Sequence, residues 1–153
     1  MVGVTVDERG LDRLRVALRD LSSTDVFVGI LASGKANEAH AGGAVTQLDV
    51  GTWMEFGTGH VPERSFLRET IAVKRNEIET RLAAEVRKVL TGKQGVDAAM
   101  EHVGQFVVGL CQARIKEGIG PELDQSTIDR KGSSTPLIDT GQLRSSITYE
   151  VRR

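Results

Sequence analysis

The chain has little of what marks several special classes of protein. Among its 153 residues are one cysteine, three prolines, one Trp, one Tyr and four Phe. The single cysteine, Cys111, excludes an internal disulfide and is typical of a reducing compartment. No apolar run approaches the roughly 20 residues of a membrane-spanning helix, and the start, MVGVTVDERG, lacks the regions of a signal peptide. We therefore expect a soluble protein made in the cytoplasm, without membrane contact.

The charge is balanced, with 20 basic and 21 acidic residues and a net charge of −1. This balance predicts no overall attraction to nucleic acid or to anionic membranes. The length is that of one domain, here expected to span residues 1–153. With 39% hydrophobic but only 4% aromatic residues, the core of this domain should be mainly aliphatic.

Three stretches have the pattern of β-strands. Val2, Val4 and Val6 alternate with small residues, and Ile147, Tyr149 and Val151 alternate with polar ones. Residues 25–31, DVFVGIL, are apolar on both faces, as in a strand covered on each side. We expect a small antiparallel sheet of three or four strands.

Helical periodicity dominates the rest of the chain. One leucine stripe follows Asp7, a plausible N-cap; a long helix should run from Ser65 to Gly92, and another from about residue 96 to Gly118. The four-residue break between the long helices favours an antiparallel pair, although one bent helix is an alternative. The prediction is an α+β fold, with the sheet packed against two main helices. The leucine stripe comprises Leu11, Leu14, Leu18 and Leu21.

Two connections, about residues 33–47 and 119–136, are longer than most structureless loops in compact domains. We expect both to be flexible in the monomer and to order against other protein copies.

No set of residues predicts catalysis, a cofactor or a metal. His40, His60 and His102 have no metal-ligand spacing, and no nucleophile motif occurs. Glu55 lies between two aromatic residues, where the pKa of a carboxyl group could be raised for general-acid chemistry. Packing, or an ion pair with Arg64 or Arg68, is the stronger expectation. We therefore predict a protein that is not an enzyme.

The segment WMEFGTGHVPERSFLR, residues 53–68, holds the only Trp and two of the four Phe. Trp, Phe and Arg are enriched at protein interfaces. Equally, Trp53, Phe56 and Phe66 could fill the core where a short helix or turn, LDVGTWMEFG, meets the long helix. Both interpretations remain open at this point.

Two stretches resemble the small tail-component proteins of long-tailed bacteriophages, also described as tail-completion, neck or virion-morphogenesis proteins. WMEFGTGHVPERSFLRET resembles the family's E-[FY]-G-T…[IV]-P-x-R-x-F-[LM]-R signature, and STPLIDTGQLRSSITYEV resembles its C-terminal P-L-x-D-T-G-x-L-x-x-S-I stretch. The order is that of the family, and the resemblance covers about residues 25–152. Glu63 and Ser65 stand where family members often have Ala and Pro. The first stretch carries the interface or structural residues Trp53, Glu55, Phe56, Gly57, Thr58, Pro62, Arg64, Phe66, Leu67 and Arg68. The second carries Pro136, Leu137, Asp139, Thr140, Gly141, Leu143, Ser146 and Ile147.

The resemblance implies a structural virion protein without cofactors. Copies of the chain would form a ring, expected to be sixfold, at the head–tail junction or the head-proximal end of the tail. This ring would contact the head connector and the tail terminator or tail tube proteins. DNA would pass through its lumen without specific binding.

Two alternatives come from other classes of protein. A nucleic-acid-binding or regulatory adaptor could use Arg13, Arg15 and Arg19. A small hydrolase would need a catalytic set drawn from Glu55, His60 and Asp139, for which no motif provides support.

Overall fold

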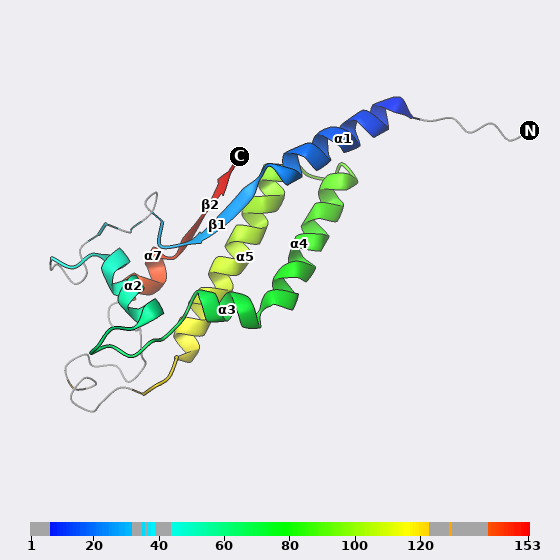
Figure 1. Cartoon of the computed structure of the whole chain (residues 1–153). Helices are drawn as coiled ribbons and strands as arrows, with labels where there is room; N and C mark the ends of the chain where they lie inside the picture. Colours follow the sequence, from blue (N-terminus) through cyan, green and yellow to red (C-terminus); the bar gives the residue numbers. More distant parts are fainter. Residues whose placement is uncertain (1–6, 32–34, 36, 39–43, 123–128, 130–140) are drawn as a thin grey trace, which may run out of the picture.

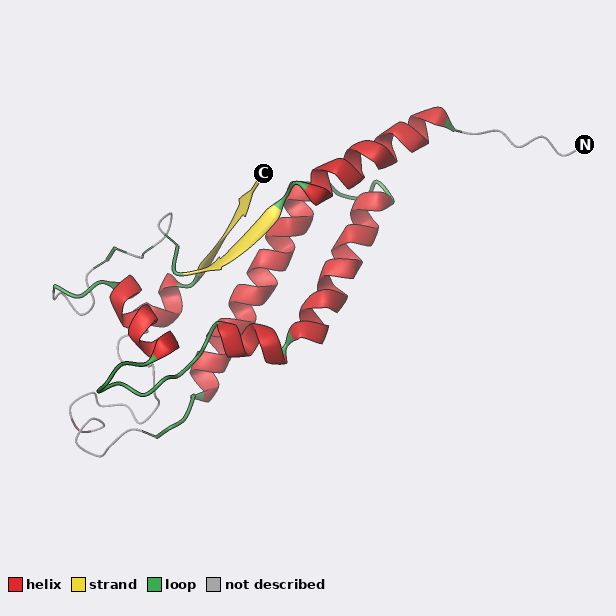
Figure 2. Cartoon of the chain, in the orientation of Figure 1, coloured by secondary structure: helices red, strands yellow, loops and turns green. Residues whose placement is uncertain are grey.

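The computed structural model describes residues 7–31, 35, 37–38, 44–122, 129 and 141–153. Its central element is the helix α5, Val96–Glu117, which packs against α4, Arg75–Leu90, and against a small sheet (Figure 1). The fold is mixed but mostly helical, with one two-stranded antiparallel sheet among the described residues (Figure 2).

The apolar spacing along α5 explains its central place. Its buried residues recur every three or four positions, so they form one face. Cys111 lies on this face and is fully buried, as expected of a small core residue, and burial raises the pKa of its thiol to about 11. The helix ends at Gly118, which has a positive φ, as the sequence predicts. The buried face consists of Val96, Ala99, Met100, Val103, Gly104, Val107, Cys111 and Ile115.

The sheet pairs β1, Asp25–Gly29, with β2, Thr148–Arg152. The register places Asp25 opposite Arg152 and Gly29 opposite Thr148. A glycine on α5 lets β2 approach closely, because a Cβ at Gly104 would lie 2.5 Å from the ring of Tyr149. The first and last strands of the described chain therefore share one helical support.

The expected three or four strands are not confirmed, because the described residues contain two. The strand predicted at Val2–Val6 lies outside the described residues. The prediction that residues 25–31 are covered on both faces is wrong. Phe27 is exposed, with the Arg152 guanidinium 4.7 Å from its ring centroid. The reason is that α5 supports the sheet from one side only, a tertiary feature that an apolar run does not reveal.

The long helix expected from Ser65 is divided in two. α3, Arg68–Val73, is followed by α4, and the break falls at Lys74. No proline or glycine marks this position, so local sequence gave no signal. α3 crosses near the C-terminal end of α5, whereas α4 returns beside α5 as the expected antiparallel partner (Figure 1). The predicted stop at Gly92 is confirmed, since α4 ends at Leu90 and Gly92 has a φ of 71°.

Three more helices lie at the two ends of the molecule. α1, Glu8–Ser22, projects from the end where α4 and α5 join, while α2, Gln47–Phe56, and α7, Gln142–Ser146, lie together at the other end (Figure 1). α7 lies directly before β2 in the sequence. Apolar residues of α2, α5 and α7 form the larger of two core clusters.

Most of the two long connections, 33–47 and 119–136, lies outside the described residues. The described start of the second connection packs against the rest of the molecule, because Ile119 is buried in the larger core cluster.

Candidate functional site

The candidate site is the chain from α2 to α3, which contains the first of the two sequence stretches singled out above. α2 begins with a capping box in which Thr46 and Asp49 bond reciprocally. The Asp49 carboxylate accepts hydrogen bonds from the backbone N–H and the hydroxyl of Thr46, at 2.9 and 2.6 Å. These bonds, the side-chain bond first, lower the pKa of Asp49. The short helix is thus fixed at its start.

Glu55, the last residue but one of α2, accepts most of the hydrogen bonds that hold the segment together. Its Oε1 accepts from the Ser65 hydroxyl at 2.7 Å and from the backbone N–H and Nε of Arg68 at 2.9 and 3.1 Å. Its Oε2 accepts from the backbone N–H groups of Phe66 and Leu67, both at 2.9 Å. Glu55 is 3% exposed. Its carboxylate therefore caps the start of α3, where backbone N–H groups have no partner within the helix.

The weaker alternative for Glu55, a raised pKa, is wrong. Burial acts to raise it, but the hydrogen bonds from Arg68, Leu67 and Ser65 outweigh burial and lower the pKa below its ordinary value. The ion pair with Arg68 is confirmed at 3.1 Å. The alternative partner, Arg64, instead donates two hydrogen bonds to the carbonyl oxygen of Pro121, at 2.9 and 3.3 Å. Buried Arg64 thereby ties the segment to the chain that follows α5.

A tight loop connects the end of α2 with the residues that bond to Glu55. Gly57 has a φ of 72°, and a Cβ there would lie 3.0 Å from the backbone nitrogen of Glu63. The Thr58 hydroxyl accepts from the backbone N–H groups of His60 and Val61, at 3.3 and 3.0 Å. The loop returns to α2 through a bond from the Arg64 N–H to the Met54 carbonyl at 2.7 Å. Glycine and threonine in this stretch thus have specific backbone roles.

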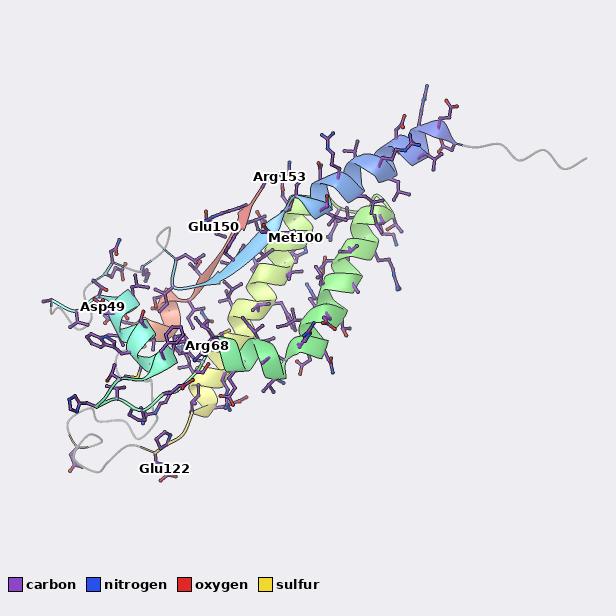
Figure 3. All side chains as sticks on the ribbon, in the orientation of Figure 1. Asp49, Arg68, Met100, Glu122, Glu150 and Arg153 are labelled. Carbon is purple, nitrogen blue, oxygen red and sulfur yellow. The ribbon has the colours of Figure 1, made fainter. Side chains whose placement is uncertain are left out.

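The aromatic residues of the segment divide into two groups. Phe66 is fully buried in the larger core cluster, against which Leu67 also packs. Phe56 is 60% exposed, and Trp53 is exposed as well. The guanidinium of Arg68 lies 4.6 Å from the Phe56 ring centroid, and Figure 3 places Arg68 where the connection from α2 reaches α3. The interpretation that the aromatic residues fill the core is thus confirmed for Phe66 and wrong for Trp53 and Phe56, which lie at the surface. Their role in an interface stays a prediction.

The second stretch meets the first at α7. Leu143 is buried in the same cluster as Val50 of α2, and a hydrogen bond of 3.1 Å joins the side-chain amides of Gln47 and Gln142. Gly141 has a φ of 74° and precedes α7. This hydrogen bond spans 95 residues of sequence, and Phe66 of the first stretch belongs to the same cluster as Leu143, so the two stretches are brought together. Ser146 and Ile147 are buried there too, Thr58 and Pro62 are exposed, and Pro136, Leu137, Asp139 and Thr140 lie outside the described residues.

A groove of about 270 Å³ runs beside the exposed aromatic side chain of Phe56. Its walls are one face of α2, the end of β1 with the residues after it, and the chain at the start of α3, Phe66 to Arg68. We define the α2 groove by Gly29, Ile30, Leu31, Leu48, Thr52 and Phe56. Its volume lies slightly below the roughly 300–1,000 Å³ of typical small-molecule sites, and suits a few apolar side chains.

A second buried carboxylate, which the sequence analysis did not identify, joins α4 to α5. Glu85 is fully buried and accepts hydrogen bonds from Lys88 at 2.9 Å and from Gln94 at 2.6 Å. Arg81 and His102 lie 3.0 and 3.3 Å from its oxygens. These bonds, chiefly that from Lys88, lower the pKa of Glu85 to about 2. Only the spacing of Arg81, Glu85 and Lys88 within one helix could have indicated this, because Gln94 comes from the turn and His102 from α5.

The remaining candidates have no cluster around them. His60 is exposed, half-buried His102 contacts Glu85, and His40 lies outside the described residues. Within the described ranges, no three His, Cys, Asp or Glu side chains are grouped to hold a metal ion. Among the helices of the described residues, none is long and apolar enough to cross a membrane.

Comparisons of the chain with protein-family models, with curated proteins and with solved structures find no match.

Proposed function

We propose that the chain is a structural virion protein that forms a ring at the head–tail junction, or at the head-proximal end of the tail, of a long-tailed bacteriophage. The ring, which we propose to be sixfold, joins the head connector to the tail terminator or tail tube around the DNA channel. The proposal starts from the resemblance of two sequence stretches to the tail-completion proteins. It is a proposal of assembly, with no reaction and no cofactor.

The hydrogen bonding of the Glu55 carboxylate is the observation that supports a structural role for the chain. An acid in a catalytic site presents its carboxyl group to a substrate. Glu55 instead directs both oxygens at the backbone of residues 66–68 and at two neighbouring side chains. Its lowered pKa also disfavours the protonated form that a general acid needs. The carboxylate is therefore suited to holding a connection rigid.

The surface beside this rigid connection supports an interaction role. Trp53, Phe56 and Leu48 are exposed on α2, close to charged and polar residues. Exposed aromatic side chains on a rigid support are typical of protein interfaces, because little conformational entropy is lost when they are covered. We expect this end of the molecule to contact another protein of the assembly.

Deletion of the gene from the phage tests the function. We expect electron microscopy of the lysate to show DNA-filled heads and finished tails that are not joined, and supply of the intact gene in trans to restore virions. Virions of normal appearance and infectivity without the gene would contradict the proposal.

Contact with nucleic acid is the second candidate, since Arg13, Arg15 and Arg19 lie on the exposed helix α1. Two of these arginines lie near acids of their own surface, Arg13 at 3.9 Å from Asp7 and Arg15 at 3.3 Å from Asp12. Duplex DNA titrated at several salt concentrations distinguishes the candidates. An affinity that falls steeply with salt would favour this second role.

A further inference from the structure

The strand β1 has a free edge. β2 occupies its other edge, and residues 25–29 have no further backbone partner in the described part of the chain. Unpaired N–H and C=O groups along an edge are a template for another strand, and proteins often protect such edges with charged side chains. β2 carries Glu150 and Arg152, whereas residues 26–29 of β1, Val-Phe-Val-Gly, carry no charge. The edge of β1 is therefore the less protected of the two.

The side chains of β1 suit extension of the sheet at this edge. Val26 and Val28 are half-buried and pack against the two core clusters, so the inner face of β1 is apolar. Phe27 lies on the outer face, beside the guanidinium of Arg152. A third strand with apolar residues on its inner face would continue the row of Val26 and Val28, and would add stability to a sheet of only two strands.

The segment that fits this edge is residues 2–6, which precede the first described residue, Asp7. Its three valines alternate with glycine and threonine, the pattern of a strand with one apolar face, and it carries no charge. The other segments outside the described residues lie between residues 32 and 43 and between 123 and 140, and their sequences have no such alternation. Residues 2–6 are therefore the strand that the chain itself can supply.

Residues 2–6 cannot reach β1 of their own chain. The 15 residues of α1 separate the two over about 22 Å, and Ala17 and Leu21 hold the base of α1 against the smaller core cluster. An extended chain spans at most about 3.6 Å per residue, so Val2, five residues before Asp7, stays within about 18 Å of it. β1 runs on from the base of α1, away from the start of this helix (Figure 1).

We infer that residues 2–6 of one copy add as a third strand to the free edge of β1 in a second copy of the chain. Each copy then gives one strand and receives one, so a single kind of contact covers both unpaired elements. A strand from a different protein would cover the edge but leave the valines of residues 2–6 uncovered in every copy. The inference deepens the proposed ring, and it rests on that function only for the closure of successive contacts into a ring.

Two lysine substitutions in the donated strand test which of its faces is covered. Val4→Lys places a charge on the inner face, and Thr5→Lys, the matched control, places the same charge on the outer face. Deletion of residues 2–6 removes the strand. All three changes lie before α1, so circular dichroism should show unchanged helical content.

Sedimentation equilibrium up to about 1 mM chain detects self-association with dissociation constants near 1 mM. We expect the deletion and Val4→Lys each to weaken association at least about tenfold, because the strand is lost or a charge is buried without a partner. Thr5→Lys should stay within about twofold of the unmodified chain. Equal effects of the two lysine variants, or no effect of the deletion, would overturn the inference.

Disulfide trapping identifies the edge and covers the case of a contact too weak for sedimentation. Phe27 of β1 and Glu150 of β2 lie opposite each other in the register, so they form a matched pair of positions. Under mild oxidation a Thr5→Cys chain should cross-link to a Phe27→Cys chain. It should not link to a Glu150→Cys chain, because a strand beside β1 lies about 10 Å from β2, too far for a disulfide. Native Cys111 is fully buried.

Four results of this trapping would overturn the inference. The first is the lack of a mixed cross-link, and the second is preferential linkage to Glu150→Cys, which would place the strand at the other edge. The third is preferential linkage of Thr5→Cys chains to one another, which would indicate pairing between two N-terminal segments. The fourth is a disulfide within a monomer that carries both Thr5→Cys and Phe27→Cys, which would indicate docking in the same chain.

A synthetic peptide of residues 1–8 tests the edge of β1 without assembly. Added at up to about 1 mM to the chain that lacks residues 2–6, it should slow hydrogen exchange of the outward-directed backbone amides in β1. The same peptide with Val4→Lys should have no effect. Unchanged exchange in β1 would overturn the inference. These results are independent of the gene deletion, so unjoined heads and tails without peptide binding or cross-linking would retain the proposed function and reject the strand contact.

Discussion

The two ends of this protein differ in how far their side chains are buried. Around Glu55, apolar groups reach the core and polar groups satisfy the backbone, so that Phe66 is fully buried and both oxygens of the carboxylate are bonded. Along α1, leucines and charges alike lie at the surface, and none of its residues is fully buried. The same residue types thus build a rigid connection at one end and an open surface at the other.

This contrast shows where stability and interaction are located. Buried side chains contribute to stability through packing contacts that are lost when the side chain is truncated. Exposed leucines contribute little until a partner covers them. Substitutions at the Glu55 end should therefore change the free energy of unfolding more than substitutions on α1.

The largest difference should come from removal of large apolar side chains. Phe66→Ala should lower the free energy of unfolding by about 3–5 kcal/mol, because it leaves a cavity in the core. Leu18→Ala, at an exposed position of α1, should lower it by less than about 1 kcal/mol. Urea denaturation followed by circular dichroism measures both. Similar losses for the two variants would show that α1 is covered within its own chain.

Removal of charge from the buried carboxylate should come next. Glu55→Gln keeps the shape but replaces one acceptor oxygen by an amide donor that faces backbone N–H groups, so we expect a loss of about 2–4 kcal/mol. Asp12→Asn removes the acid of an exposed pair on α1, 3.3 Å from Arg15, and should cost less than about 1 kcal/mol. The same denaturation experiment compares them. A tolerated Glu55→Gln would remove the main argument for a structural role of this residue.

Addition of one methyl group should change the stability in opposite directions at the two ends. Gly57→Ala forces a side chain into a positive-φ conformation with backbone 3.0 Å away, and should destabilise the protein by about 1–2 kcal/mol. Gly10→Ala lies within α1, where the new Cβ meets only the movable side chain of Asp7, and should stabilise by up to about 1 kcal/mol. Melting temperatures report both signs. Destabilisation by Gly10→Ala would indicate that α1 is more closely packed than its exposure suggests.

The lowered pKa of Glu85 predicts that stability decreases in acid. The pKa of Glu85 is about 2 in the folded chain, below its ordinary value near 4.5. A lowered folded-state pKa gives stability that is complete above the unfolded pKa and is lost as pH falls, so the free energy of unfolding should decrease between about pH 5 and pH 2. Glu85→Gln should make this decrease shallower. Glu79→Gln, in an exposed pair with Arg75, is the control, and the same slope in both variants would assign the acid sensitivity elsewhere.

Much of the helical structure could be predicted because its signals are local. Gly92 and Gly118 follow the ends of α4 and α5 as expected, and the spacing of apolar residues identified the buried face of α5. The break at Lys74 escaped prediction because it has no local signal and follows from the different packing of α3 and α4.

The residues of the candidate site were predicted better than their roles. The sequence indicated the importance of residues 53–68, yet the capping of α3 by Glu55 depends on side-chain and backbone groups 10 to 13 residues away. It also left open whether the aromatic residues were core or surface, and the structure divides them, with Phe66 inside and Phe56 outside.

The sequence by itself determined the mainly aliphatic composition, the balanced charge and the helices with their glycine stops, because each depends on residue type or on neighbours within a few positions. Only the tertiary structure decided which apolar faces are covered. Leu18 and Val107 both belong to regular helical stripes, but one is exposed and the other is buried. Burial depends on which elements the chain brings together across long separations, and periodicity carries no information about that.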